Sequence, residues 1–404
     1  MGLVERTSSR CAGRAKAFKS PGAWHAAGFL AEADLSANAI ERARRAAPAY
    51  IDLTSSNPTH QGLIFPVEML RAAAEPYWFA RRYEPDARGL LAAREAISRY
   101  YSGRTPALLV PPDQIVITAS TSEAYGLLFT LLADPGDNFL APNVAYPLFE
   151  HLAAAHHVTL RSYQLDESCG WQIDEATLLR AADARTRGVL IVSPHNPTGM
   201  IVQQPIAALE RLGLPVICDE VFAEFTYRAP HTPPLAALHP ALPVFTLNGI
   251  SKMFALPDLK LGWIAMNVPA ASAFGARLEI LNDIYLGANS LTQAMLPALF
   301  EHGLAFTAAM RQRIRASLDA ALAVLKGCPA LQVRPPDGGY YLFPRVMCQD
   351  DEEALVLKLL ERGVLVHPGF FYGCEDGTHI MISCLSAPEV LVRGLELIVE
   401  TLTT

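Results

Sequence analysis

The side chains most able to do chemistry follow one another through the middle of the chain. Asn196 opens an Asn-Pro-Thr-Gly turn, Asp219 closes an apolar run, and Ser251-Lys252 follows another. An amine can form a Schiff base with an aldehyde cofactor, while a carboxylate keeps the ring nitrogen of that cofactor protonated. We therefore predict that Lys252 is the Schiff-base lysine, and that its amine later moves a proton between carbons as base and then acid.

Other polar and aromatic residues stand where neighbouring runs end. Ser120-Thr121-Ser122 opens an expected helix, where free amides and short hydroxyls suit a phosphate, although an ordinary helix cap explains the same residues. Tyr146 can stack on a flat heteroaromatic ring or simply belong to the core. The Asn196 amide can donate to a ring hydroxyl or to a substrate carboxylate, or can hold a turn.

The elements that position these residues form a regular pattern. Strands are expected at residues 115–118, 138–141, 188–193, 216–219 and 244–247, with a helix at 122–133. Strands that are apolar on both faces and separated by helices predict a mostly parallel sheet covered on both sides. In such a sheet ligands bind beyond the carboxyl ends of the strands, which is where the polar residues stand.

The rest of the chain reads differently. It is helical from about 270 to 325, then has shorter strands, and closes with a helix at about 388–401. We expect an α/β fold with a large domain over 51–270 and a smaller α+β domain built from 23–50 and 271–404. Residues 1–22 are basic and are interpreted as a loose arm; a transit peptide is the alternative interpretation.

Composition excludes several classes of protein. A chain of 404 residues with 51% hydrophobic and 18% charged residues can bury a large core. The net charge of −7 argues against nucleic acid as the partner, and no apolar run is long enough to span a membrane. The 7 cysteines form no Cys-x-x-Cys pair, which favours a reduced, cytoplasmic setting without a metal site. No Gly-x-Gly-x-x-Gly supports a nicotinamide dehydrogenase.

The order of these motifs resembles the class I/II aminotransferases, the fold-type I enzymes that use pyridoxal 5′-phosphate. The resemblance covers most of the chain. It is carried by Asp52-Leu53 through Asn57-Pro58, Tyr83 with Gly89, Ser120-Thr121-Ser122, Tyr146, Asn196-Pro197-Thr198-Gly199, Asp219-Glu220, Ser251-Lys252 and Pro368-Gly369. It implies a three-layer large domain with a mostly parallel sheet, and a smaller α+β domain.

The resemblance also implies a role for each matched residue. Lys252, Asp219 and Tyr146 are the expected catalytic residues. The cofactor is expected to meet Ser120, Thr121, Ser122, Tyr146, Asn196, Asp219, Phe222, Ser251, Lys252 and Lys260, and Tyr83 to reach the phosphate in a neighbouring subunit. Ser56, Asn196 and Met381 are the expected substrate contacts.

Some positions depart from the family pattern. Phe222 replaces a tyrosine whose hydroxyl donates to the phenolate oxygen of the cofactor, and Lys260 replaces an arginine that grips the phosphate. Gly249 stands where a serine is frequent. Met381 replaces the arginine that binds the substrate α-carboxylate. Either Arg345 takes over that task, or the substrate offers no carboxylate at this place.

The resemblance implies an aminotransferase that moves an amino group from an amino acid or amine to a keto acid or aldehyde. It further implies a homodimer with active sites at the subunit interface. A lyase, decarboxylase or oxidase on the same scaffold is the alternative, and a non-catalytic ligand sensor is a third. Residues 370–372 are aromatic and form either a hydrophobic pocket wall or ordinary core.

Overall fold

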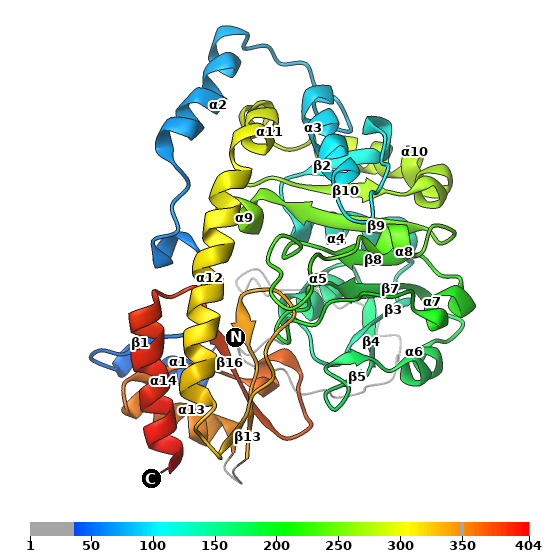
Figure 1. Ribbon diagram of the computed structural model, residues 1–404. Coiled ribbons are helices and arrows are strands. Elements are labelled where there is room, and N and C mark those ends of the chain that lie inside the picture. The colour runs from blue at the N-terminus through cyan, green and yellow to red at the C-terminus, as the bar shows by residue number, and fades with distance from the viewer. Residues whose placement is uncertain (1–35, 348–350, 404) are drawn as a thin grey trace, which may run out of the picture.

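The computed structural model describes residues 36–347 and 351–403, and a seven-stranded sheet forms its centre (Figure 1). In spatial order the strands are β2 (Ile115–Thr118), β10 (Gly262–Met266), β9 (Val244–Gly249), β8 (Val216–Asp219), β7 (Thr186–Val192), β3 (Asn138–Pro142) and β4 (Thr159–Tyr163). Neighbouring strands are parallel except for β10, which is antiparallel to both β2 and β9. The prediction of a mostly parallel sheet is confirmed.

Alternate side chains of the central strands enter two separate cores. Phe139, Leu190 and Ile217 belong to one, while Leu140 and Cys218 belong to the other. The helices around this sheet are α3 (Leu91–Ser102), α4 (Thr121–Leu132), α5 (Leu148–Ala155), α6 (Glu175–Ala181), α7 (Ala207–Leu212), α8 (Leu235–Leu238) and α10 (Val268–Ile284). Burial on both faces explains why these strands read as continuous apolar runs.

A second, smaller group of strands lies beside the first in Figure 1. It contains β11 (Leu331–Gln332), β13 (Arg345–Val346), β16 (Thr378–Ser383), β12 (Tyr341–Leu342) and β15 (His367–Pro368), with β1 (Ile51–Asp52) pairing β14 (Val364–Leu365) nearby. Strand β16 is central, because β12, β13 and β15 all pair with it in antiparallel fashion. This sheet carries the position of Met381.

Long helices frame the smaller sheet. Helix α12 (Leu304–Leu325) packs against α14 (Pro388–Thr403), and α1 (Ala39–Ala46) packs against α13 (Glu352–Glu361). Helix α11 (Ser290–His302) contacts α2 (Val67–Phe79) and α3. The remaining elements are short: α9 (Ile250–Met253), β5 (Leu165–Asp166), β6 (Gln172–Ile173), η1 (Thr59–Gln61), η2 (Pro112–Gln114) and η3 (Gly369–Tyr372). The arm predicted over 1–22 lies outside the described residues, and the domain boundaries stay a prediction.

Candidate active site

Three adjacent parallel strands bring the predicted residues to one edge of the large sheet. Asp219 ends β8 and is in register with Val192 of β7 on one side and Leu247 of β9 on the other. Asn196 follows β7, and Lys252 lies in α9 directly after β9. The carboxyl ends of parallel strands meet at the same edge, so the turn, the acid and the amine converge there.

The Asp219 carboxylate is buried, with 6% of the residue exposed. Its Oδ2 accepts a hydrogen bond from the Tyr125 hydroxyl at 3.1 Å, and its Oδ1 accepts one from the Val221 amide at 3.0 Å. Burial raises the pKa of Asp219 to about 6, although both hydrogen bonds and the nearby Lys252 act in the opposite direction. A protonated ring nitrogen would give this buried carboxylate a cationic partner.

The Lys252 amine faces mostly neutral groups. Its Nζ donates to the Ser56 carbonyl oxygen at 3.0 Å and lies 6.0 Å from the centre of the Phe222 ring. Burial lowers the pKa of Lys252 to about 8, against the opposing effect of Asp219. The Tyr340 hydroxyl donates to the Lys252 carbonyl oxygen at 3.0 Å and so fixes the backbone of the short helix. A lysine in this state is readily converted to the nucleophilic free amine.

Phe222 is held by aromatic contacts instead of a hydrogen bond. Its ring packs edge-to-face on Tyr340 at 4.8 Å and on Tyr341 at 5.9 Å between centroids. The residue is 3% exposed. The position is therefore filled by a ring without a hydroxyl, as the sequence predicts.

The Asn196 turn is clamped by a segment that precedes β12. Gly199 has a φ of 72°, and a Cβ there would lie 2.4 Å from Cβ of Pro336. The Gly338 amide donates to the Gly199 carbonyl oxygen at 2.9 Å. Within this rigid turn the buried Oδ1 of Asn196 has no hydrogen-bond partner among the described residues. A buried amide left in this way is suited to a ligand, because an unpaired polar group is unfavourable.

The start of α4 resembles a prepared anion site. Ser120 caps the helix, because its Oγ accepts a hydrogen bond from the Glu123 amide at 3.1 Å, and Glu123 accepts one from the Ala119 amide. The Thr121 and Ser122 side chains make no hydrogen bond within the part of the chain that the structure describes. Free amides and hydroxyls at a helix start favour a phosphate.

Two glycines allow close backbone packing here: Gly262 of β10 lies against this helix start, and Gly249 of β9 lies against β10. A Cβ at Gly262 of β10 would lie 3.0 Å from the Thr121 amide nitrogen, and a Cβ at Gly249 would lie 2.8 Å from the Leu261 carbonyl oxygen. There is consequently no room for a serine at Gly249 without movement of the backbone. Ser251 keeps a hydroxyl in the adjacent turn, with no hydrogen bond to any described residue.

Lys260 and Tyr83 point outward from the single chain. Lys260 is exposed, has a left-handed φ of 48°, and makes no ion pair with the described residues. Tyr83 is 74% exposed in the loop between α2 and α3. It lines a hollow of about 190 Å³ together with Asp283, Leu286 and Gln293. Tyr146 is 43% exposed and contacts Phe149 edge-to-face at 6.0 Å between centroids.

The donor set fits pyridoxal 5′-phosphate. The buried Asp219 suits the protonated ring nitrogen, the unpaired Oδ1 of Asn196 can accept a hydrogen bond from the ring hydroxyl, and Lys252 supplies the amine. The phosphate end has the start of α4 and the hydroxyls of Thr121, Ser122 and Ser251.

Some functional contacts join segments that are far apart in the sequence. Glu220, next to Asp219, is fully buried and forms an ion pair with Arg104 at 3.1 Å. It also accepts a hydrogen bond from the Leu235 amide at 3.1 Å. Neither Tyr125 nor Arg104 could be recognised from the sequence as a partner of these carboxylates. The one feature that could have indicated them is a polar group within an apolar helix or loop.

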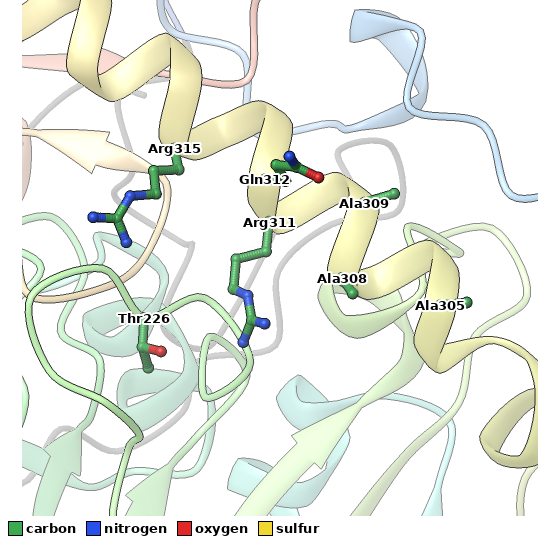
Figure 2. A pocket seen from close by; sticks show the side chains of 7 residues that line it. All are labelled: Thr226, Ala305, Ala308, Ala309, Arg311, Gln312 and Arg315. Atoms are coloured by element: carbon green, nitrogen blue, oxygen red, sulfur yellow. The ribbon is translucent and has the colours of Figure 1, made fainter.

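A separate hollow of about 590 Å³ lies along α12 (Figure 2). Its lining is Thr226, Ala305, Ala308, Ala309, Arg311, Gln312 and Arg315. The two arginines donate to the carbonyl oxygens of Glu224 at 3.5 Å and Tyr227 at 3.3 Å. None of the predicted site residues lines this hollow.

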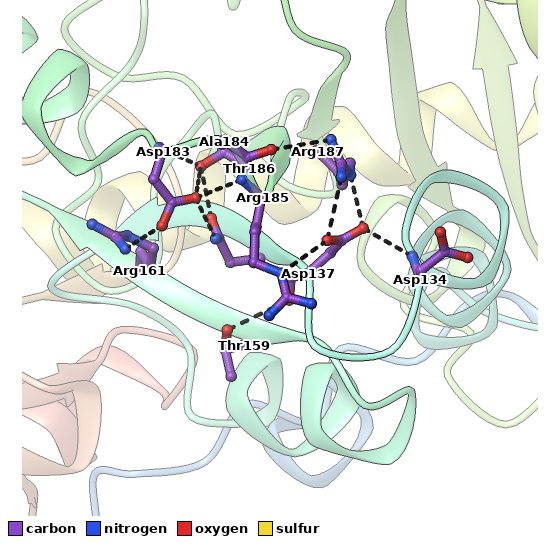
Figure 3. A network of polar contacts seen from close by, with 10 residues as sticks. Asp134, Asp137, Thr159, Arg161, Asp183, Ala184, Arg185, Thr186 and Arg187 are labelled. Atoms are coloured by element: carbon purple, nitrogen blue, oxygen red, sulfur yellow. Dashed lines mark hydrogen bonds and ion pairs between the residues drawn. The ribbon is translucent and has the colours of Figure 1, made fainter.

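The amino-terminal edge of the large sheet carries a polar network of a different character (Figure 3). Arg187 binds Asp137 at 2.7 Å, and Arg161 binds Asp183 at 2.6 Å. Asn138 donates to Asp183 at 2.9 Å. The Asp137 and Asp183 carboxylates are thus paired with arginine or amide donors. We interpret this network as structural, because it links β3, β4 and β7.

Neither metal ligation nor a membrane span is found in the described ranges, 36–347 and 351–403. No group of three or more His, Cys, Asp or Glu side chains there is placed to hold a metal ion. No helix there combines the length and apolar character needed to cross a bilayer.

A buried acid and a lysine amine at the carboxyl edge of a mostly parallel sheet, beside an open helix start, define a fold-type I pyridoxal-phosphate enzyme. The chain belongs to the family described as Aminotransferase class I and II, whose sequence pattern matches residues 49–395. Members of this family depend on pyridoxal phosphate.

Curated relatives agree with this assignment. The alanine aminotransferase of Mycobacterium tuberculosis is 28% identical over 366 residues, which cover 86% of this chain and 84% of the relative. A tyrosine aminotransferase of Dictyostelium discoideum is 30% identical over 226 residues, or 54% of each chain. The chain thus spans about half the length of that relative.

Solved structures show the same fold. The alanine aminotransferase from Pyrococcus furiosus matches with a TM-score of 0.82 at 24% identity, covering 90% of this chain and 95% of the other. The aspartate aminotransferase from Rhizobium meliloti matches with a TM-score of 0.82 at 20% identity, covering 94% and 99%. At these identities the likeness concerns the fold alone.

Proposed function

We propose that this protein is an aminotransferase that moves an amino group from a small amino donor to a keto acid or aldehyde. The observation that carries the proposal is the convergence of Lys252, Asp219 and the unpaired Asn196 amide at one sheet edge. Membership of the class I and II family supports the same reaction. The tyrosine, alanine and aspartate substrates in the names of the relatives are properties of those proteins.

Pyridoxal phosphate, when bound, supplies an aldehyde that joins to amines and a ring that accepts electrons. The Asp219 carboxylate is placed to hold a proton at the ring nitrogen. The unpaired Oδ1 of Asn196 would accept a hydrogen bond from the ring hydroxyl, and Thr121 and Ser122 would hold the phosphate. The Lys252 Nζ, with its lowered pKa, takes a proton from the donor carbon and returns it to another.

Trapping tests the proposal directly. Protein mixed with pyridoxal phosphate should develop a visible absorbance band, and borohydride should fix the cofactor to one lysine. We expect peptide mass spectrometry to locate it at Lys252, and the Lys252→Ala variant to stay colourless. Attachment at another lysine, or no band in the wild type, would refute the assignment.

Product analysis then separates transamination from the other chemistries of this scaffold. Donor and keto acceptor are incubated with a catalytic amount of holoenzyme, and the products are identified by mass spectrometry. We expect the amino group to appear on the acceptor. Released ammonia, carbon dioxide or peroxide without an aminated acceptor would assign a lyase, a decarboxylase or an oxidase instead.

We also propose that the protein is a homodimer. Exposed apolar side chains gather at the end of α2 and in the following loop, among them Trp78, Phe79 and Tyr83. Others lie at the end of α10, including Ile284 and Leu286. The two groups are neighbours, because Tyr83 and Leu286 line the same hollow and an Arg88–Glu279 ion pair at 2.7 Å joins their elements. Exposed apolar surface of this kind marks an interaction site.

A cytoplasmic location is proposed from the cysteines. The five described cysteines are all free, and four of them are buried. Unpaired thiols fit a reducing compartment. Fractionation of cells that express the full chain, with a reduced-thiol count on the isolated protein, tests this proposal.

A further inference from the structure

The face of the small sheet that looks toward Lys252 offers no unpaired cation, because Arg345 and His379, which lie on it, are both paired with Glu167. We propose that the amino donor of this protein presents an uncharged group to that face, so that its reacting carbon bears no carboxylate. This assigns the donor to the primary amines and amino alcohols. The inference rests on the proposed aminotransferase function and names the substrate class of the same site.

Strand register places Met381 on this face. Side chains alternate along β16, so Met381 and Ser383 lie on the same side. His367 of β15 is opposite Met381, and Tyr341 of β12 is opposite Ser383. The Ser383 hydroxyl donates to the Ser55 carbonyl oxygen at 2.6 Å, so this face lies against the segment that holds Lys252.

The Lys252 amine is reached from the same segment. Its Nζ donates to the Ser56 carbonyl oxygen, and Ser56 also lowers the pKa of Tyr341, against the larger effect of burial. Tyr341 also packs edge-to-face on Phe222, the ring nearest the amine. A substrate whose reacting carbon lies within reach of the Lys252 amine would therefore meet Tyr341 and the residues beside it.

The groups beside Met381 on this face are uncharged. The two basic side chains that share the face, Arg345 and His379, are both paired with Glu167, at 2.9 and 3.2 Å. Met381 is 2% exposed. Burial raises the pKa of Tyr341 and of Tyr372. The charges that further raise these two pKa values come from neighbouring tyrosines, and neither an arginine nor a lysine contributes. Burial lowers the pKa of His367 to about 4, so its ring is neutral when Nδ1 meets the Tyr372 hydroxyl at 3.1 Å.

The arginines nearest to this sheet are engaged elsewhere. Arg345 forms an ion pair with Glu167 at 2.9 Å and donates to the Asp376 carbonyl oxygen at 2.9 Å. Arg313 donates to the Gln61 carbonyl oxygen at 2.6 Å. Arg345 thus has partners already and is not free to bind a substrate carboxylate in place of Met381.

A carboxylate brought to this face would have the Lys252 amine as a cation, because that amine donates to Ser56, next to the Ser55 carbonyl that Ser383 contacts. That amine must lose its proton in order to react, so the carboxylate would then be left unpaired in a buried place. An amine donor without a carboxylate avoids this penalty. We therefore expect the face that carries Met381 to disfavour amino acids, because it offers their carboxylate no free arginine.

Matched donors test the inference, because each pair differs only in the α-carboxylate. The pairs are 2-phenylethylamine with phenylalanine and tyramine with tyrosine, added to holoenzyme while the visible cofactor band is followed. We expect kcat/KM for the amine to exceed that for the amino acid at least tenfold. The Met381→Arg variant should reverse the preference, and Met381→Leu should keep it.

A binding measurement decides the question without turnover. Calorimetric titration of the holoenzyme compares 3-phenylpropanol with 3-phenylpropanoate, and we expect the alcohol to bind more tightly. Preference for the amino acids, or tighter binding of the carboxylate, would overturn the inference, including through an arginine supplied by a second copy of the chain. If neither donor of a pair reacts, the aminotransferase proposal fails. The titration still tests whether the face that carries Met381 prefers an uncharged group to a carboxylate.

Discussion

At the scale of single residues, the site depends on a buried carboxylate and a partly buried amine whose pKa values move toward each other. Burial raises the pKa of Asp219 to about 6 and lowers that of Lys252 to about 8. At pH 7 the acid is thus mostly ionised and the amine mostly protonated, yet both titrate close to neutrality. A site in this condition can bind a cationic ring and release an amine with little expense in free energy.

The Asp219 pKa predicts how stability depends on pH in the cofactor-free protein. Between pH 3.8 and about 6 the folded state keeps a proton that the unfolded state has lost, so the free energy of unfolding falls as pH rises. The Asp219→Asn variant has no carboxylate at this position, so its free energy of unfolding should not fall in this way. Above pH 6 the variant should be more stable than wild type by up to about 3 kcal/mol.

Urea unfolding of the cofactor-free protein at pH 4 and at pH 7.5 measures this difference. It should vanish near pH 4. Asp258→Asn, at an exposed carboxylate in the loop after α9, is the matched control and should show no gain. A difference that is the same at both pH values would contradict the assignment of the shift to Asp219.

Phe222 predicts a second titration. A hydroxyl at this position would donate to the phenolate oxygen of the cofactor and stabilise its charged form. Phe222→Tyr should lower the pH midpoint of the visible cofactor band by about one unit, since one unit corresponds to about 1.4 kcal/mol. The band is titrated in holoenzyme, with Phe222→Leu as the control. Identical midpoints in wild type and Phe222→Tyr would reject the idea.

At the scale of elements, the phosphate end is shaped by how closely β10 approaches the start of α4 and β9 approaches β10. Gly262 permits β10 to approach α4, because a Cβ there would lie 3.0 Å from the Thr121 amide nitrogen, and Gly249 permits β9 to approach β10, because a Cβ there would lie 2.8 Å from the Leu261 carbonyl oxygen. Such contacts with backbone are not relieved by rotating a side chain. The glycine at 249 is therefore a packing requirement and not merely a lost phosphate ligand.

Gly249→Ser should therefore weaken the fold instead of improving the cofactor grip. Overpacking of this kind typically costs about 1–3 kcal/mol. Chemical unfolding and cofactor titration measure the two effects separately. Gly327→Ser is the matched control, because a Cβ at Gly327 meets nothing within 4 Å. Tighter cofactor binding in Gly249→Ser with unchanged stability would show that the backbone can yield.

The convergence of the candidate residues could be predicted from the sequence, because they stand at the ends of parallel strands. Asn196, Asp219 and Lys252 all follow parallel strands, so their convergence is read from the order of elements. Tyr125 and Arg104 could not be predicted, because each reaches its carboxylate across the fold, the first from 94 positions away.

Two strands of the large sheet, β4 and β10, are not fully predicted by the pattern of apolar residues. Strand β4 is largely exposed at the sheet edge and carries polar residues, so it lacks the apolar signature of its neighbours. Strand β10 is apolar, but nothing in its own residues indicates that it runs antiparallel. Direction is settled by the short α9 connection and by pairing with both β2 and β9.

At the scale of the whole molecule, the proposed homodimer would cover the exposed apolar surface at the ends of α2 and α10. Tyr83 lies in this surface, and the resemblance to the family gives it a role at a neighbouring subunit. Oligomeric state and activity should therefore be coupled, since loss of the partner would remove Tyr83 from its site.

Charge placed in this surface tests the coupling. Ile284→Glu, at a residue that is 69% exposed, should shift the protein from dimer to monomer and lower kcat at least tenfold by an order-of-magnitude estimate. Light scattering coupled to gel filtration gives the mass. Val268→Glu, 61% exposed at the other end of α10, is the matched control. A monomeric wild type, or a variant that remains dimeric and active, would refute the interface.

The hydrogen bond from Lys252 to the Ser56 carbonyl has a thermodynamic corollary. The amine that anchors this amino-terminal segment is the one that the cofactor claims, so the two bonds compete for one nitrogen. Linkage is reciprocal: loading the cofactor loosens the segment, and whatever braces the segment lowers cofactor affinity by the same factor. Amide hydrogen exchange at residues 54–57 would then quicken when vitamin B6 aldehyde is added, a local mobility gained on ligation.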